Sequence, residues 1–221
     1  SFCYEDGVDE KTLKTDSNHL KSLKKKSVKE LERVTEGVDL GVKVMGQTTK
    51  DKYDYSDIAK QRLVSLEKKR TRYQRWMARQ IKTSKRRKKT KSKISKTYIK
   101  QAEIRHDFCH KTSRKLVDQE NITVLVFENL KTKNMTRKPK AKQDEHGRWL
   151  KNKAKAKGGL NKAIVSKGWY KLELYTGYKA YRANKVVFKV SPHYTSQECA
   201  DCGHIHPENR KSQSLFVCCS C

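Results

Sequence analysis

Four cysteines near the end of the chain form the pattern with the clearest capacity to bind a metal. Cys199 and Cys202 make one C-x2-C pair, Cys218 and Cys221 make a second, and fifteen residues separate the pairs. Two such turns can surround a zinc ion with four thiolates at zinc–sulfur distances near ~2.3 Å. Gly203, directly after the first pair, permits the positive backbone angle that such turns often adopt. The spacing predicts a structural Zn²⁺ site, because four thiolates leave no coordination position for water.

Two disulfides are the competing interpretation of these cysteines. The chain has seven cysteines, four of them clustered, which does not resemble the even framework of a small secreted domain. A reducing cytoplasm fits this usage better. Cys219 is expected to be a bystander, and Cys3 and Cys109 to be buried apolar positions. His204 and His206 could substitute as ligands, but four cysteines already fill the coordination shell.

Two acids follow apolar segments and have the chemistry of a magnesium site. Asp39 lies in the sequence Gly-Val-Asp-Leu-Gly, and Glu128 ends the apolar run 122–127. Carboxylates at strand ends can hold a pair of Mg²⁺ ions ~3.5–4 Å apart, which activate water and stabilise the leaving oxygen of a phosphodiester. The glycines on either side of Asp39 would leave room for a phosphate backbone. An acid that ends a strand is also ordinary turn chemistry, so the residue types alone leave both interpretations open.

The elements that must position these residues alternate between strands and helices. The apolar run 122–127 predicts a strand buried on both faces, and Pro192 should stop a strand over 185–190. Short β-branched residues punctuated by glycine predict a strand that runs into a hairpin over 34–42. The other expectations are a strand end at 1–6, a linker or weak helix at 10–33, helices at 58–81, 94–116 and 160–183, and a loop at 131–157.

The charge of the chain points to a polyanionic partner. The formal net charge is +29, and residues 59–115 hold 22 Lys/Arg against 3 Asp/Glu. A charge run is often only a solvated face, but this density on two helices and the tip between them favours phosphate contact. A membrane partner is a weaker interpretation, because the basic helices have modest apolar stripes and no run reaches 18 apolar residues. The candidate phosphate contacts are Lys85, Arg86, Arg87, Lys88, Lys89, Lys91, Arg137 and Lys138.

Four aromatic residues could stack on bases, but a core or structural role is the preferred interpretation for each. They are Tyr98, Trp149, Trp169 and Tyr194.

Several of these segments, taken in order, resemble one family. They are GVDLGVK at 37–43, the basic helical hairpin, VLVFENL at 124–130, GLNKAIVSKGW at 159–169, KVVFKV at 185–190 and YTSQECADCGH at 194–204. From about residue 34 to the last cysteine the chain is similar to the TnpB (OrfB) proteins of insertion sequences. These are RNA-guided DNA endonucleases, also described as transposases, related to the type V CRISPR effectors.

The resemblance implies an α/β, RuvC-like fold of the RNase H type. Asp39 would match the first catalytic acid and Glu128 the second, both binding Mg²⁺, and the four cysteines would match the family's zinc ribbon. Target DNA and a guide RNA would be the partners. The expected divisions are 1–33 as the end of an N-terminal domain with a linker, 34–196 as the nuclease core with a basic insertion at 57–118, and 197–221 as the ribbon.

The resemblance also implies a missing part. In the family a third metal-binding Asp lies shortly beyond the ribbon, so we expect a fragment that is truncated at both ends and cleaves little by itself. Two other functions stay open: a non-catalytic zinc-ribbon module that binds nucleic acid, and a structural component of a ribonucleoprotein particle. Asp39 and Glu128 facing each other across adjacent strands would favour the nuclease, and acids pointing apart would favour the binding module.

Overall fold

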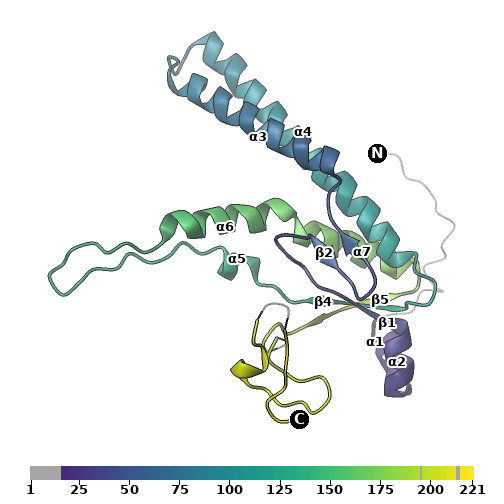
Figure 1. Cartoon of the computed structure of the whole chain (residues 1–221). Helices are drawn as coiled ribbons and strands as arrows, with labels where there is room; N and C mark the ends of the chain where they lie inside the picture. The colour runs from purple at the N-terminus through teal and green to yellow at the C-terminus, as the bar shows by residue number, and fades with distance from the viewer. Residues whose placement is uncertain (1–15, 195, 213–214) are drawn as a thin grey trace.

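Three parallel strands form the centre of the protein. The computed structural model describes residues 16–194, 196–212 and 215–221. The strands β1 (Thr35–Val38), β4 (Val124–Glu128) and β5 (Val186–Val190) pair in the order β1-β4-β5 (Figure 1). Val38 lies opposite Phe127, and Glu128 lies opposite Val190. Parallel neighbours need long crossover connections, which the helices between them supply here.

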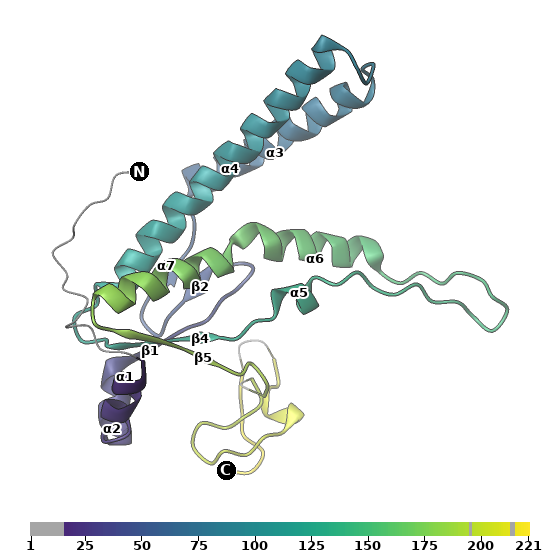
Figure 2. The same cartoon turned by 180° about the vertical axis from the view of Figure 1, so that it is seen from behind.

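The prediction of a buried strand at 122–127 is confirmed by β4. Leu125 and Phe127 are fully buried in the main hydrophobic cluster, and Val124 is buried as well. The helices α4 (Lys85–Val117) and α7 (Trp169–Arg182) pack against each other and supply the other half of this cluster, including Cys109, Leu116, Leu172 and Ala180. Figure 2 shows both helices on the same side of the sheet.

Two residues for which the sequence left more than one role open, Cys109 and Trp169, belong to this core. Cys109 is fully buried, as expected for an apolar position, and burial raises the pKa of its thiol to about 11. Trp169 is also buried, which confirms the expectation of a core role before base stacking. Cys3 and the strand expected at 1–6 lie outside the described residues.

A short hairpin continues from β1, as the sequence predicts. The strands β2 (Gly46–Gln47) and β3 (Lys52–Tyr53) are antiparallel, and Gln47 forms an antiparallel bridge with Asp39. Two backbone hydrogen bonds of 2.8 Å join Asp39 to Gln47. The hairpin therefore extends the sheet at the end of β1.

The predicted helical hairpin is present but starts its second helix earlier than expected. The first helix, α3 (Asp57–Ala78), packs along α4, which begins at Lys85 and so includes most of the basic stretch expected at the tip. Lysine and arginine are good helix formers, and the Ser84 hydroxyl accepts the amide of Arg87 as an N-cap. The positive charge therefore lies on the first turns of a long helix.

Two other expectations differ from the structure. The helix expected at 160–183 is two helices, α6 (Ala154–Lys167) and α7, because Gly168 between them takes a φ of +79° and ends the first. The loop expected at 131–157 contains α5 (Thr132–Met135) and then a finger of two arms, residues 136–153, joined by one β-bridge. Figures 1 and 2 both show this finger extending away from the sheet.

The remaining segments lie on the other side of the sheet from α4 and α7. The helices α1 (Asp16–Leu23) and α2 (Val28–Val34) form the segment expected to be a linker or weak helix, and a capping box of Ser27 and Glu30 begins α2. The cysteine-bearing segment follows β5 and contains one 3-10 turn, η2 (Pro207–Asn209). None of the described helices is long and apolar enough to cross a membrane.

A pair of glycine substitutions tests the turn after Asp39. A Cβ on Gly41 would lie 2.7 Å from the carbonyl oxygen of Val44, whereas a Cβ on Gly37 would meet nothing within 4 Å. We predict that Gly41→Ala lowers the free energy of unfolding by about 1–3 kcal/mol because the backbone must shift. Gly37→Ala should leave it within about 0.5 kcal/mol, as for a surface change. Urea denaturation of both variants measures this, and equal midpoints would contradict the account.

Candidate active site and metal centre

The structure brings Asp39 and Glu128 together at one edge of the sheet. Asp39 directly follows β1, and Glu128 is the last residue of β4. Because Val38 pairs with Phe127 in parallel register, the two acids occupy the next pair of positions along these strands. Side chains alternate along a strand, so both acids project from the face opposite Val38 and Phe127. Asp39 is exposed and Glu128 is half-buried.

A hollow with a volume of about 330 Å³ contains both acids. Gly37 contributes open space to it, as the sequence predicts, since no atom would contact an added Cβ. The same expectation for Gly41 is wrong, because that glycine is required by the close approach of the Val44 carbonyl. The full lining is Gly37, Val38, Asp39, Gln47, Thr48, Thr49, Val126, Phe127, Glu128 and Val190.

The rim of the hollow is held by a buried acid that sequence reasoning missed. Glu36 in β1 is buried, and its carboxylate accepts a hydrogen bond of 2.8 Å from the backbone amide of Thr49. Thr48 adds bonds to Asp51 within the same turn. The turn between β2 and β3 is therefore fixed against β1. Glu36 is the neighbour of Gly37 in the strand, so its side chain points to the opposite face from Gly37 and Asp39. This alternation was the sequence feature that could have separated its role from that of Asp39.

The four cysteines converge as the spacing predicts. The Sγ atoms of Cys199, Cys202, Cys218 and Cys221 all lie within 4.8 Å of one another. Two of the separations are 3.7 Å, from Cys199 to Cys221, and 3.6 Å, from Cys202 to Cys218. A tetrahedron of thiolates at ~2.3 Å from a central ion has edges of about 3.8 Å. The cluster can therefore hold one metal ion.

Each C-x2-C turn has backbone bonds that shape it. Gly203 has a φ of +71°, as predicted, and its amide donates to the carbonyl of Cys199 over 2.9 Å. In the second turn, the amides of Cys221 and Ser220 donate to the Sγ of Cys218 over 3.5 and 3.3 Å. These two N–H groups lower the pKa of the Cys218 thiol to about 6. At Cys218 the backbone thus favours the thiolate that a metal requires. The pKa of Cys221 is raised instead, because its thiol faces the three other sulfurs.

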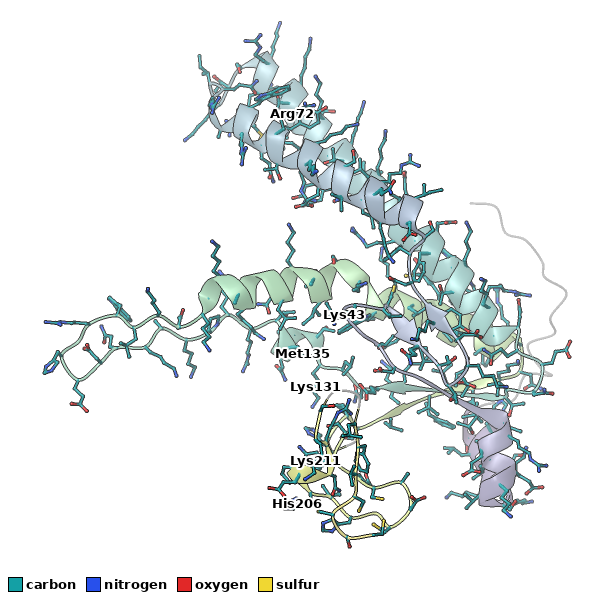
Figure 3. All side chains as sticks on the ribbon, in the orientation of Figure 1. Lys43, Arg72, Lys131, Met135, His206 and Lys211 are labelled. Carbon is teal, nitrogen blue, oxygen red and sulfur yellow. The ribbon has the colours of Figure 1, made fainter. Side chains whose placement is uncertain are left out.

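The other expected candidates stand outside this cluster. Cys219 is exposed and is not among the four converging thiols. The rings of His204 and His206 stack on each other at 5.9 Å, and His206 Nδ1 accepts the amide of Glu208. Figure 3 shows His206 on this segment. Within the described residues, then, neither histidine joins the metal-binding group.

One buried amide joins the two turns, and sequence reasoning missed it. Asn209 is fully buried, and its amide group donates to the carbonyls of Gln197 and His204 over 2.8 and 3.0 Å. Its side-chain oxygen accepts the amide of Cys219 over 2.9 Å. A single side chain therefore connects the segment before the first turn, the end of the first turn and the second turn.

The predicted phosphate contacts fall into two groups by exposure. The exposed candidates are Lys85, Arg86, Lys88, Lys89 and Lys91 on the first turns of α4, and Arg137 and Lys138 in the finger. Arg87 differs, because its half-buried guanidinium donates to the carbonyls of Met77 and Gln80 at the end of α3. A cation at a helix C-terminus is favourable there, so Arg87 joins the two helices.

A groove of about 940 Å³ separates the helical hairpin from α6. Its cations outnumber its acids: it is lined by Lys43, Lys60, Lys68, Arg70, Arg105, Lys162 and Lys167 against Asp54 and Glu67. Lys162 bridges the groove to Glu67 over 2.6 Å and lowers the pKa of that carboxyl. Tyr98 lies on the wall with the Arg70 guanidinium 4.5 Å from its ring centroid. Figure 3 shows Lys43 between the helical hairpin and the sheet.

Comparison with known proteins finds two family models on this chain. Residues 1–139 match the OrfB_IS605 model, described as "Probable transposase". Residues 169–221, which include the four-cysteine cluster, match the model described as "Cas12f1-like, TNB domain". The two matches together cover the sheet, the helical hairpin and the cluster.

Individual relatives agree with these models. The chain is 38% identical over 152 residues to the "Putative RNA-guided DNA endonuclease InsQ" of Escherichia coli (strain K12), which is 69% of this chain and 36% of InsQ. It is 43% identical over 53 residues to the "CRISPR-associated endodeoxyribonuclease Cas12f1" of Sulfoacidibacillus thermotolerans, which is 24% of this chain and 13% of that protein. The chain therefore spans only about a third or less of these curated relatives.

A solved structure shares the fold. It is a chain of the "Cryo-EM structure of the Cas12f1-sgRNA-target DNA complex", with a TM-score of 0.54 and 18% sequence identity. The match covers 85% of this chain and 36% of that one. The mixed α/β fold of this chain, with its parallel sheet, is thus similar to the fold of that chain.

Replacement of Asn209 tests whether the cluster depends on more than its ligands. We predict that Asn209→Ala weakens metal binding at least about tenfold, because it leaves buried backbone groups without partners at each turn. Cys202→Ser should remove the metal, and Cys219→Ser should retain it. Mass spectrometry measures the metal content of each variant, and competition with a chromophoric chelator measures its metal affinity. Unchanged affinity in Asn209→Ala would contradict the role assigned to this residue.

Proposed function

Because the chain belongs to the OrfB family of transposases, we propose that it is the nuclease-bearing part of a transposon-encoded, RNA-guided DNA endonuclease. One observation supports this most strongly. Asp39 and Glu128, far apart in the sequence, occupy adjacent positions on parallel strands and line one hollow. The alternative, a non-catalytic nucleic-acid-binding module, gives no reason for the two acids to converge.

We propose that the sheet is the core of a RuvC-like, RNase H-type domain. The β2–β3 hairpin attached to β1, followed by the parallel order β1-β4-β5, supports this assignment. In this division residues 34–196 form the nuclease core, 57–118 form a basic helical insertion, and 197–221 form a zinc ribbon. The ribbon would hold Zn²⁺ as a structural ion, because all four ligands are thiolates and the sulfur separations fit the tetrahedral zinc site.

Asp39 and Glu128 are suited to Mg²⁺ as a donor set of oxygens only, the ligand type that this ion prefers. When bound there, Mg²⁺ would activate water and stabilise the leaving oxygen of the DNA backbone. The protein's own contribution is position. The bridge to Gln47 fixes the backbone of Asp39. The strand β4 pairs with β1 as far as Phe127, and Glu128 itself pairs with Val190 of β5. The open space beside Gly37 admits a phosphodiester to the two carboxylates.

Nucleic acid would be held by the basic surfaces around this site. We propose that the groove between the hairpin and α6, with the exposed lysines at the start of α4, contacts the phosphates of the guide RNA and target DNA. Such contacts read backbone and shape, while base pairing with the guide would provide sequence specificity.

The catalytic assignment predicts the effect of removing each acid. In a protein that joins this chain to the third acid expected from the family resemblance, loaded with its guide RNA, Asp39→Ala and Glu128→Ala should each reduce Mg²⁺-dependent cleavage of a matching target DNA to background. Neither should weaken RNA binding, since both acids would repel phosphate in the absence of metal. Glu120→Ala, an exposed acid in the turn before β4, is the matched control. Normal cleavage by either acid variant would exclude the nuclease assignment at this hollow.

The phosphate contacts predict a change in salt dependence. Replacing Lys88, Lys89 and Lys91 with Gln should lower the slope of log affinity for a short RNA against log salt by roughly 2, because each phosphate contact contributes about 0.7–0.9. The same change at Lys24, Lys25 and Lys29, exposed residues near α1 and α2, should leave the slope unchanged. Fluorescence anisotropy at several salt concentrations measures both slopes. Equal slopes for the two triple variants would contradict the proposal, because RNA affinity would then depend only on the net charge of the protein.

A further inference from the structure

The finger, residues 136–153, is a projection that carries two exposed apolar side chains on its second arm, next to the turn. Its two arms join through a bridge between Gln143 and Trp149 and a bond of 2.9 Å from the Leu150 amide to the Lys142 carbonyl. Trp149 is 71% exposed, so the core role expected for it from the sequence is wrong, and Leu150 is 51% exposed. Large apolar side chains at this exposure, on an arm that packs against no core, lose hydrophobic stabilisation unless a partner covers them.

The turn at the tip is specified residue by residue. The Asp144 carboxylate accepts the amides of His146 and Arg148 over 3.0 and 2.7 Å, and the amide of Asp144 donates to the Arg148 carbonyl over 2.9 Å. Gly147 takes a φ of +75°, which favours glycine. The turn therefore presents Trp149 in a defined place on the arm.

The root of the finger follows the proposed active site along the chain and is fixed to α6. The finger begins a few residues after Glu128, at the end of α5. Lys157 on α6 donates to the Met135 carbonyl, and Asn161 donates to the Thr136 carbonyl, each over 2.7 Å. Figure 3 shows Met135 beneath α6. From this root to Trp149 an extended arm covers on the order of 20 Å.

The charge of the finger selects the kind of partner. It has seven Lys/Arg and two acids, and its exposed cations lie on both sides of Trp149. Lys151 lies two residues from Trp149 and so projects from the same face of the arm. These cations are Lys140, Lys142, Arg148, Lys151 and Lys153. An aromatic ring flanked by cations is complementary to a base with its neighbouring phosphates.

We propose that the finger holds an unpaired nucleotide, with its base stacked on Trp149 and the adjacent phosphates on Lys151 and Arg148. The inference rests on the proposed function, since it places this nucleotide on a strand that also passes the acid hollow. The contact lies several nucleotides from the scissile phosphate. Stacking tolerates any base, so the finger would position the strand without reading its sequence.

The test measures binding of short oligo(dT), short oligo(U) and a blunt DNA duplex of equal length to the full chain. Trp149→Ala should weaken binding of at least one single strand about tenfold, and Trp149→Phe should restore most of it. In a Trp76→Phe background, that strand should quench the emission of the exposed Trp149, with the buried Trp169 as a constant signal. Selective loss with oligo(U) would place the nucleotide in RNA, and selective loss with oligo(dT) would place it in DNA.

Two further variants make the test specific to the finger. Gly147→Ala strains the turn and should weaken single-strand binding although Trp149 is present. Tyr170→Ala removes a comparably exposed aromatic side chain elsewhere, on α7, and should leave binding within about twofold. The proposal is overturned if Trp149→Ala binds both single strands normally, or if duplex binding falls equally. Failure of the endonuclease proposal would appear separately, as normal cleavage by Asp39→Ala.

Discussion

The parallel pairing of β1 with β4 is the constraint on which the proposed site depends. Val38 and Phe127 face each other across these strands and are buried together under α4 and α7. A slip of one residue would turn Phe127 toward solvent and Glu128 into the core, at a large cost in free energy. Burial of apolar side chains on one face thus fixes the acids on the other. The same packing that stabilises the fold sets the position of the two carboxylates.

Charge is separated across the molecule in a way that suits a polyanionic substrate. The hairpin, the groove beside α6 and the finger carry the excess of lysine and arginine, while the hollow carries two carboxylates. A net charge of +29 repels itself and would oppose a compact arrangement of these parts. Nucleic acid bound across the basic surfaces would relieve that repulsion and carry its backbone to the acids. The hairpin itself is held together by Arg87, which illustrates that one cation in such a run can be structural.

Features encoded by local pattern were predictable from the sequence. The apolar run that becomes β4 and the two C-x2-C turns are examples, because strand burial and tetrahedral thiolate geometry both require a fixed spacing. The convergence of Asp39 and Glu128 was expected from a family resemblance, since spacing alone does not determine which strands become neighbours. It is the strand register that places them side by side.

Features that depend on distant partners were not predictable in this way. Asn209 binds backbone groups of three separate segments, and nothing in its sequence neighbours indicates them. The break at Gly168 and the early start of α4 at Lys85 depend on single residues, a glycine in the left-handed region and a serine cap. The finger has few apolar residues in periodic order, so its pattern resembles a loop, although Asp144 and Gly147 define its turn.

A double-mutant cycle of metal binding tests the central claim, that two carboxylates form one site. Mn²⁺ affinity is measured by electron paramagnetic resonance for the unaltered chain, Asp39→Asn, Glu128→Gln and the double variant. If both side chains bind the same ions, each single variant loses affinity, and the double variant loses clearly less than the sum of the two losses in free energy. Additive losses, or unchanged affinity in either single variant, would contradict the account.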